Sequence, residues 1–68
     1  MDHLDHLRHI EHLVDAAALS RLTGLSPKYI YALAARGEMP HYRIGRAIRF
    51  VPSEIAVWLL QRRCGGLL

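Results

Sequence analysis

The four residues Gly24-Leu25-Ser26-Pro27 constrain the fold of this chain more than any other stretch. A helical pattern stops at Gly24, and Gly24-Leu25-Ser26 turn the chain. Ser26 can cap a new helix with its hydroxyl, and Pro27 suits the first helical position, where a missing N–H costs nothing. One helix must therefore end and another begin within this stretch. The sequence predicts two short helices joined by a tight turn, which is the helix-turn-helix arrangement.

The first helix is expected at residues 16–23, with the sequence AAALSRLT. Asp15 can cap this helix with its carboxylate, and Val14 and Leu19 are spaced as a hydrophobic staple. The expected core face of the helix comprises Ala18, Leu19 and Leu22.

The second helix, SPKYIYALAARG, is expected to end at Gly37, a natural left-handed cap, and Pro40 prevents it from resuming. At about 100° per residue, its core stripe comprises Ile30, Leu33 and Ala34. The opposite side carries Lys28, Ala32, Ala35 and Arg36, with Tyr29 and Tyr31 on its two flanks. Taken alone, this pattern also fits an ordinary amphipathic helix with a basic face in solvent.

The stretch HYRIGRAIRF at residues 41–50 predicts a β-hairpin. A two-residue turn of Gly45-Arg46 would mix polar and apolar side chains on each face of the hairpin. A three-residue turn that adds Ala47 gathers the apolar side chains on one face, and the hydrophobic pattern normally sets the register. We therefore expect the pairs Ile44–Ile48, Arg43–Arg49 and Tyr42–Phe50.

The expected register sets Arg43 and Arg49 directly opposite each other, with Arg46 at the tip of the hairpin. Like charges in directly opposite positions destabilise a hairpin. An anionic partner would relieve this repulsion. The alternative is an edge hairpin whose arginines serve solubility.

The last helix is expected to begin near Pro52 and to run through PSEIAVWLLQRR. Glu54 near its start, and Arg62 and Arg63 near its end, suit the helix dipole. The expected core stripe of this helix comprises Ile55, Trp58 and Leu59.

Charge divides the chain into an acidic leader and a basic body. Residues 1–15 hold one basic residue against four acidic ones, a net charge of −3, whereas residues 16–68 hold eight Lys and Arg against two Glu, a net charge of +6. A basic body suits nucleic acid, although many basic domains bind none. The single cysteine, Cys64, suits a reducing cytosol, and no apolar run approaches membrane-spanning length. We expect a soluble protein of the cytoplasm that does not bind membranes.

The leader repeats one triplet four times, as DHLDHLRHIEHL at residues 2–13. Steps of three residues advance about 300° on a helix, so the repeated histidines fan across half its circumference and cannot all converge on one ion. These histidines are His3, His6, His9 and His12. We expect residues 1–12 to be a loosely structured arm without a metal site. An oligomer contact and a metal or pH sensor are the weaker alternatives.

Enzymatic activity is not expected from this inventory of side chains. So few groups cannot assemble a nucleophile with its base, a glycine-rich phosphate loop or paired carboxylates in a cleft. No cofactor or small-molecule ligand is expected either. The competing non-enzymatic function is a protein-interaction module that docks on a larger partner through Val57, Leu60, Leu67 and Leu68.

The predicted order is helix, turn, helix, two-stranded wing and closing helix. Over residues 13–63 the chain resembles the excisionase-like, MerR-related winged-helix DNA-binding domains. The matching pieces are LTGLSPKYIYALAARGEMP, YRIGRAIRF and EIAVWL, and RGEMPHYRIGR is the most specific of the matching stretches. The expected fold is thus mostly α with a small β-hairpin: a winged helix-turn-helix at residues 13–64, followed by a short apolar tail at residues 65–68.

The resemblance implies a small bacterial or phage protein that binds double-stranded DNA. Its second helix would enter the major groove, and its wing would lie against the backbone or in the minor groove. Some relatives are recombination directionality factors, which bind and bend DNA at an attachment site to favour excision by an integrase, and others are small transcriptional regulators. The implied DNA-binding residues are Ser26, Pro27, Lys28, Tyr29, Tyr31, Ala32, Ala35 and Arg36 in the recognition helix, and Arg43, Gly45, Arg46 and Arg49 in the wing.

Ala32 and Ala35 depart from the family, in which these positions are often arginine or another polar residue. Alanine can contact a thymine methyl group but cannot hydrogen-bond a base. We therefore expect modest intrinsic specificity, with much of the affinity coming from phosphate contacts and DNA shape. Such a protein would act as several copies bound cooperatively to adjacent sites, with an integrase as a further partner.

Overall fold

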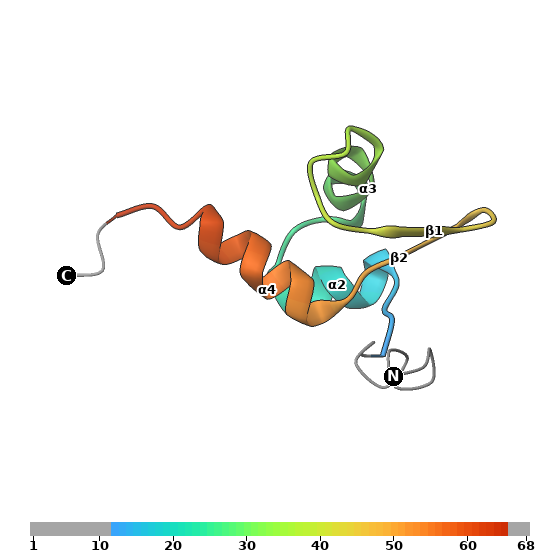
Figure 1. Cartoon of the computed structure of the whole chain (residues 1–68), viewed down its shortest axis with the longest axis horizontal. Coiled ribbons are helices and arrows are strands. Elements are labelled where there is room, and N and C mark those ends of the chain that lie inside the picture. The colour runs from blue at the N-terminus through green and yellow to red at the C-terminus, as the bar shows by residue number, and fades with distance from the viewer. Residues whose placement is uncertain (1–11, 66–68) are drawn as a thin grey trace, which may run out of the picture.

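The computed structural model describes residues 12–65 of the 68-residue chain. Its elements are α2 (Ala16–Thr23), α3 (Pro27–Ala35), β1 (Tyr42–Ile44), β2 (Ala47–Arg49) and α4 (Pro52–Gln61). In Figure 1, α3 lies on one side of the hairpin base, α2 and α4 lie on the other, and the hairpin extends away from the helices. This arrangement confirms the predicted winged helix-turn-helix fold. Within residues 12–65, no helix combines the length and the apolar character needed to span a bilayer.

The turn between α2 and α3 forms from the local signals that predicted it. The Asp15 carboxylate caps α2 by accepting from the Ala18 amide at 2.9 Å. Gly24 ends α2 in the left-handed conformation, with a φ of +81°. The Ser26 hydroxyl caps α3 by accepting from the Tyr29 amide at 3.1 Å. These bonds satisfy amides that a helix start otherwise leaves unpaired, so the turn is specified by its own residues.

The end of α3 is a Schellman motif centred on Gly37, whose φ is +70°. The Gly37 amide donates to the Ala34 carbonyl, and the Glu38 amide donates to the Leu33 carbonyl, both at 2.9 Å. In this motif the two amides beyond the helix satisfy its last carbonyls. The predicted end of the helix is confirmed, and the motif also fixes the backbone of Glu38 against α3.

The core joins the three helices to Phe50, which is fully buried. The Phe50 amide donates to the Val14 carbonyl at 2.8 Å, and the Phe50 carbonyl accepts from the Val14 amide at 2.9 Å. The other side chains of the buried cluster are Ala16, Leu19, Ile30, Leu33, Ala34, Met39, Ile55 and Trp58. The predicted core stripe of α3 is thereby confirmed. Met39, in the loop after α3, was not predicted to be part of the core.

Two residues that the helical period assigns to the core are exposed instead. Leu22 is 66% exposed and Leu59 is 43% exposed, and Ala18 is only half-buried. Leu22 and Leu59 line an open groove of about 180 Å³ between α2 and α4. Because this groove stays open to solvent, Leu22 of α2 and Leu59 of α4 are not buried against each other. The prediction of a closed core at these two positions was wrong.

The predicted hairpin register was also wrong. The observed pairs are Tyr42–Arg49, Arg43–Ile48 and Ile44–Ala47, around a two-residue turn of Gly45-Arg46. Gly45 has a φ of +62°, whereas Arg46 has no positive φ, which is the pattern of a type II′ turn. Phe50, the predicted partner of Tyr42, is bonded to Val14 instead, so it is not available to the hairpin.

The observed register separates the hairpin arginines. Directly opposite residues share a face of a ribbon, so Arg43 lies on the same face as Ile48, and Arg49 on the same face as Tyr42. The predicted repulsion between two facing arginines is therefore absent.

A hydrogen bond between side chains ties the hairpin to α4. The Tyr42 hydroxyl donates to the Glu54 carboxylate at 2.8 Å. This bond, with partial desolvation as a smaller cause, raises the pKa of Tyr42 above its ordinary value. The base of the hairpin is thus held against the first turn of α4.

Replacing Tyr42 with phenylalanine is expected to lower the melting temperature by a few degrees, because the bond to Glu54 is lost. The raised pKa of folded Tyr42 means that this contribution is present below the ordinary tyrosine pKa and is lost as the pH rises through the folded-state value. Thermal melts of the parent and Tyr42→Phe at neutral pH and at successively higher pH measure both effects. Equal melting temperatures at neutral pH would contradict the prediction.

Candidate nucleic-acid interface

One face of α3 is open to solvent, and it carries most of the residues predicted for the recognition helix. The exposed residues are Ser26, Pro27, Lys28, Tyr29, Tyr31, Ala35 and Arg36, whereas Ala32 is half-buried. Tyr29 and Tyr31 each keep about half of their surface exposed, at 48% and 49%. An α-helix fits the major groove of B-DNA, so this face can present a cation and two phenol groups to base edges.

The first turn of α3 offers one open amide to an anion. Pro27 has no N–H, and the Tyr29 amide is bonded to the Ser26 hydroxyl. The Lys28 amide is therefore the one that stays open to an anion, and the side chain of Lys28 also carries an ammonium group. A phosphate at the positive end of the helix would therefore be held mainly by Lys28.

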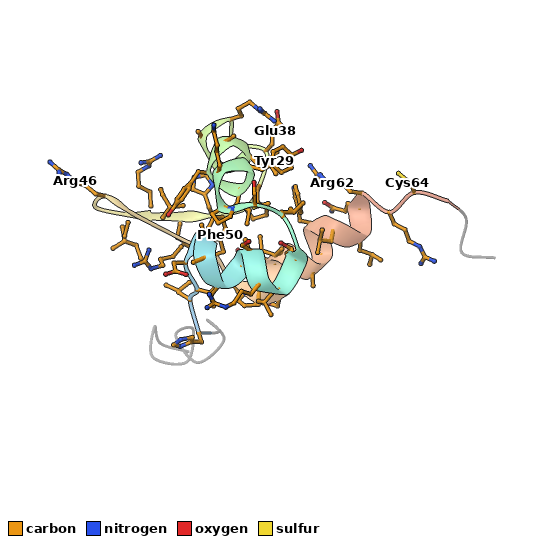
Figure 2. The ribbon with its side chains drawn as sticks, turned by 180° about the vertical axis from the view of Figure 1, so that it is seen from behind. Tyr29, Glu38, Arg46, Phe50, Arg62 and Cys64 are labelled. Atoms are coloured by element: carbon orange, nitrogen blue, oxygen red, sulfur yellow. The ribbon has the colours of Figure 1, made fainter. Side chains whose placement is uncertain are left out.

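Arg46 lies at the far end of the hairpin, beyond the helices, as Figure 2 shows. Arg43 lies on the hairpin face opposite Tyr42, and Tyr42 reaches toward α4 through Glu54. Arg43 is therefore directed away from α4, toward the side of the hairpin on which Figure 1 shows α3. Arg43 and Arg46 are both exposed. These two wing residues can meet the same polyanion as α3.

Arg49 has a different environment from the other two wing arginines. It is half-buried, and its guanidinium donates to the Ile48 carbonyl at 2.9 Å. It shares the hairpin face of Tyr42, which is turned toward α4. The prediction that Arg43 and Arg49 lie on the same outward face was wrong, because it depended on the three-residue turn.

Arg36, at the C-terminal end of α3, forms an ion pair that the sequence analysis missed. Its Nε donates to Glu38 Oε2 at 3.0 Å and its Nη2 donates to Oε1 at 3.2 Å. The hydrogen bond with Glu38 raises the pKa of Arg36, and the same bond lowers the pKa of Glu38. The two side chains are 55% and 51% exposed. The sequence does contain a signal for this ion pair, because Arg36 and Glu38 flank Gly37 with opposite charges. The Schellman motif at Gly37 turns the two side chains toward each other.

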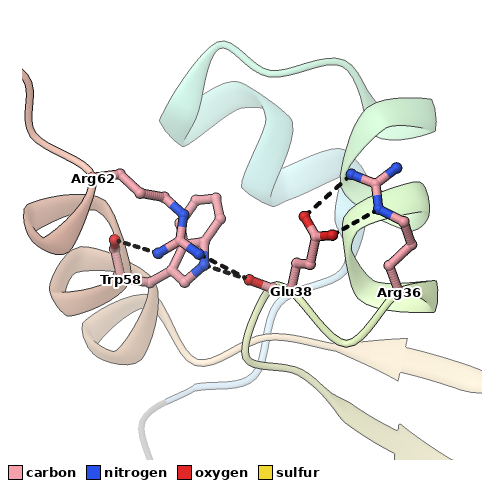
Figure 3. A network of polar contacts seen from close by, with 4 residues as sticks. All are labelled: Arg36, Glu38, Trp58 and Arg62. Atoms are coloured by element: carbon pink, nitrogen blue, oxygen red, sulfur yellow. Dashed lines mark hydrogen bonds and ion pairs between the residues drawn. The ribbon is translucent and has the colours of Figure 1, made fainter.

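The backbone carbonyl of Glu38 is held by α4 (Figure 3). The indole Nε1 of Trp58 donates to this carbonyl at 2.6 Å, and Arg62 Nη2 donates to it at 3.4 Å. The Arg62 guanidinium lies 4.1 Å from the centre of the Trp58 ring and donates to the Trp58 carbonyl at 3.2 Å. The loop after α3 is thus fastened to α4, which fixes the angle at which α3 is presented. This link joins residues 20 or more positions apart, and no local signal predicts it.

Residues 12–65 carry a strong excess of positive charge. They hold eight Lys and Arg against three carboxylates, and each of these three carboxylates is hydrogen-bonded within the protein. The carboxylates are those of Asp15, Glu38 and Glu54. A surface of this kind attracts polyanions over several ångströms and carries few carboxylates that would repel them.

The predicted histidine arm lies outside the described residues, apart from His12, which is exposed. In the described part of the chain, no three His, Cys, Asp or Glu side chains come together in a group that could hold a metal ion. His41 is half-buried and its Nδ1 lies 2.9 Å from the Met39 carbonyl.

A family model described as a helix-turn-helix domain matches residues 13–63, which is three quarters of the chain. No curated protein and no solved structure matches the chain. The matched region spans α2, the turn, α3, the hairpin and α4, so it contains both surfaces described above. The chain therefore belongs to this family of DNA-binding helix-turn-helix domains.

Proposed function

We propose that the protein binds double-stranded DNA, with α3 in the major groove and the tip of the hairpin against the adjacent backbone or minor groove. The observation that carries this proposal is the placement of its cations: Lys28 at the start of α3, with Arg43 and Arg46 on the projecting hairpin. Phosphate contacts by these three residues would fix the position of the domain on the duplex. Tyr29 and Tyr31 would reach base edges.

The base-reading surface is small, and this shapes the proposed mode of action. Ala32 and Ala35 can offer only methyl contacts, and the charge of Arg36 is already balanced by its ion pair with Glu38. One copy would therefore discriminate weakly among sequences. We propose that several copies bind tandem sites cooperatively, through contacts between copies or a shared DNA bend.

Among the roles open to such a protein, we favour a recombination directionality factor. It would bind and bend DNA at an attachment site in the bacterial cytoplasm and so promote excision by an integrase, without catalysing any step itself. Cooperative binding by weakly discriminating copies would suit this role, because the product of such binding is a shaped DNA segment. A transcriptional regulator of the same fold is the alternative.

In a binding titration, the logarithm of the association constant should fall linearly with the logarithm of salt concentration. Three phosphate contacts predict a slope of about −2.7 for each bound copy, since each contact contributes about 0.9. Fluorescence anisotropy with a duplex selected from a random pool, and with a random-sequence duplex, measures this slope. A duplex carrying two copies of the selected site should bind cooperatively. Binding that is absent, or that does not respond to salt, would overturn the proposed function.

The recombination role has a separate test. Adding the protein to an integrase and a DNA substrate that carries the paired attachment sites should raise the yield of the excised circle. Cooperative DNA binding without any effect on excision would favour the transcriptional alternative.

A further inference from the structure

Glu38 is fixed in place through its backbone from two directions. Its amide is bonded to the Leu33 carbonyl within the Schellman motif, at 2.9 Å. Its carbonyl accepts from the Trp58 indole at 2.6 Å and from Arg62 at 3.4 Å. Both ends of the residue are therefore restrained, and its side chain is presented beside the last turn of α3 (Figure 3).

The carboxylate of Glu38 occupies one hydrogen-bonding edge of the Arg36 guanidinium, formed by Nε and Nη2, and balances its charge. The two bonds, at 3.0 Å and 3.2 Å, join groups only two residues apart across one fixed turn. Paired bonds of this kind are more directional than a single contact between charges. Because the hydrogen bond to Arg36 lowers the pKa of Glu38, the carboxylate stays ionised at neutral pH and keeps the guanidinium engaged.

The pair lies on the surface that the DNA is proposed to approach. Arg36 and Glu38 are each about half exposed, at 55% and 51%. The other two carboxylates of the described residues serve elsewhere, since Asp15 caps α2 and Glu54 bonds Tyr42. At the end of α3, a phosphate would therefore meet a guanidinium whose positive charge is already balanced by the Glu38 carboxylate.

We infer that Glu38 limits the number of phosphate contacts that the domain makes, by keeping the Arg36 guanidinium bonded to its own carboxylate. This inference rests on the proposed DNA binding and refines it: Arg36 is held back from the backbone, while Lys28, Arg43 and Arg46 make contact. Glu38 thereby weakens binding to every sequence alike, which limits the time spent on non-specific DNA. The positioning of Glu38 depends on the Trp58 indole, so α4 takes part in setting the affinity.

The test is the salt dependence of DNA binding by Glu38→Gln. The glutamine keeps the backbone carbonyl that Trp58 and Arg62 hold, but it loses the charge that engages Arg36. Arg36 should then add one phosphate contact and steepen the salt slope by about 0.9 on selected and random duplexes alike. Between about 200 mM and 50 mM salt, the affinity of Glu38→Gln should therefore rise roughly 3.5-fold more than that of the parent.

Two further variants separate this inference from a general charge effect. Glu54→Gln makes the same change of charge, and its amide oxygen can still accept from Tyr42, so its slope should match the parent slope. Adding Arg36→Ala to Glu38→Gln should remove the extra contact and restore the parent slope. Thermal melts of all variants identify any loss of folding.

The outcomes discriminate clearly between the two proposals. A parent slope that is clearly negative, combined with an unchanged or shallower slope for Glu38→Gln, would overturn the role of Glu38 and leave the proposed DNA binding intact. The same holds if Glu54→Gln steepens the slope equally, or if the steeper slope survives the added Arg36→Ala. A parent that shows no salt-dependent binding would instead overturn the proposed function itself.

Discussion

Replacing Phe50 with alanine is expected to remove most of the free energy of unfolding and to lower the melting temperature sharply. Phe50 is fully buried in the cluster that joins the three helices, and its backbone is bonded on both sides to Val14. Truncating a buried phenylalanine typically costs about 3–5 kcal/mol, from lost burial and from the cavity left behind. A domain of this size has only about 3–8 kcal/mol of stability in total, at roughly 0.05–0.15 kcal/mol per residue.

Circular dichroism during thermal and urea unfolding measures this effect. The matched control is Leu60→Ala, which removes an apolar side chain that is 66% exposed and should change the free energy of unfolding by less than about 0.5 kcal/mol. Phe50→Leu retains much of the volume and should cost less than the alanine variant. If Phe50→Ala melts close to the parent, the three helices do not depend on this residue to pack together.

The features that could be predicted from the sequence are those whose cause lies within a few residues. Asp15 and Ser26 cap the helices that follow them, and Gly24 and Gly37 end the helices that precede them, as their local patterns indicated. The core stripe of α3 was predicted for the same reason, since a short helix packed on one side keeps its period. Together these signals were sufficient to predict the helix-turn-helix.

The hairpin register could not be predicted because it depends on a residue far away in the chain. The hydrophobic pattern favoured the pairing of Phe50 with Tyr42, but Phe50 is bonded to Val14, 36 positions earlier. A local signal for the correct turn was present, because glycine in the first position of a two-residue turn suits type II′ geometry. In the observed register the turn residues prevail over the local hydrophobic pattern, so the face predicted for Arg49 was wrong.

The groove between α2 and α4 shows a second limit of periodicity. The spacing of Leu22 and Leu59 places each on the apolar side of its helix, and that much was predicted. Whether two apolar sides meet depends on the angle and the distance between the helices, which the sequence of either helix does not contain. Here the helices leave a space of about 180 Å³, so both side chains remain exposed.

For the candidate site, the sequence predicted the residue types on the exposed side of α3. It did not predict which of these side chains are already paired within the protein. Lys28, Tyr29 and Tyr31 are open to solvent as expected, whereas Arg36 is engaged by Glu38. That engagement depends on the Schellman motif and on the Trp58 indole, which together bring Glu38 beside α3. The net charge and the helical pattern of the sequence include Arg36 and Glu38, but neither shows that the two side chains are paired.

The largest expected loss of DNA binding comes from removing Arg43 and Arg46 together. Both are exposed, Arg46 lies at the hairpin tip, and Arg43 lies on the face turned away from α4. If each contacts one phosphate, the double alanine variant should flatten the salt slope by about 1.8 units on selected and random duplexes alike. Between about 200 mM and 50 mM salt, the affinity of the parent should then rise roughly 12-fold more than that of the variant. Anisotropy titrations across a salt series measure the difference, with thermal melts to show that the variant remains folded.

Arg49→Ala is the matched control, because it removes the same charge from the same hairpin. Its guanidinium is half-buried, bonded to the Ile48 carbonyl and placed on the face that Tyr42 turns toward α4. Its removal should leave the salt slope within about 0.3 units of the parent, whereas Arg43→Ala alone should flatten the slope by about 0.9. If Arg49→Ala flattens the slope by about 0.9 and Arg43→Ala leaves it unchanged, the DNA lies against the opposite face of the hairpin. In that case α3 and the hairpin could not share one duplex in the way proposed, because the contacting face would be turned away from α3.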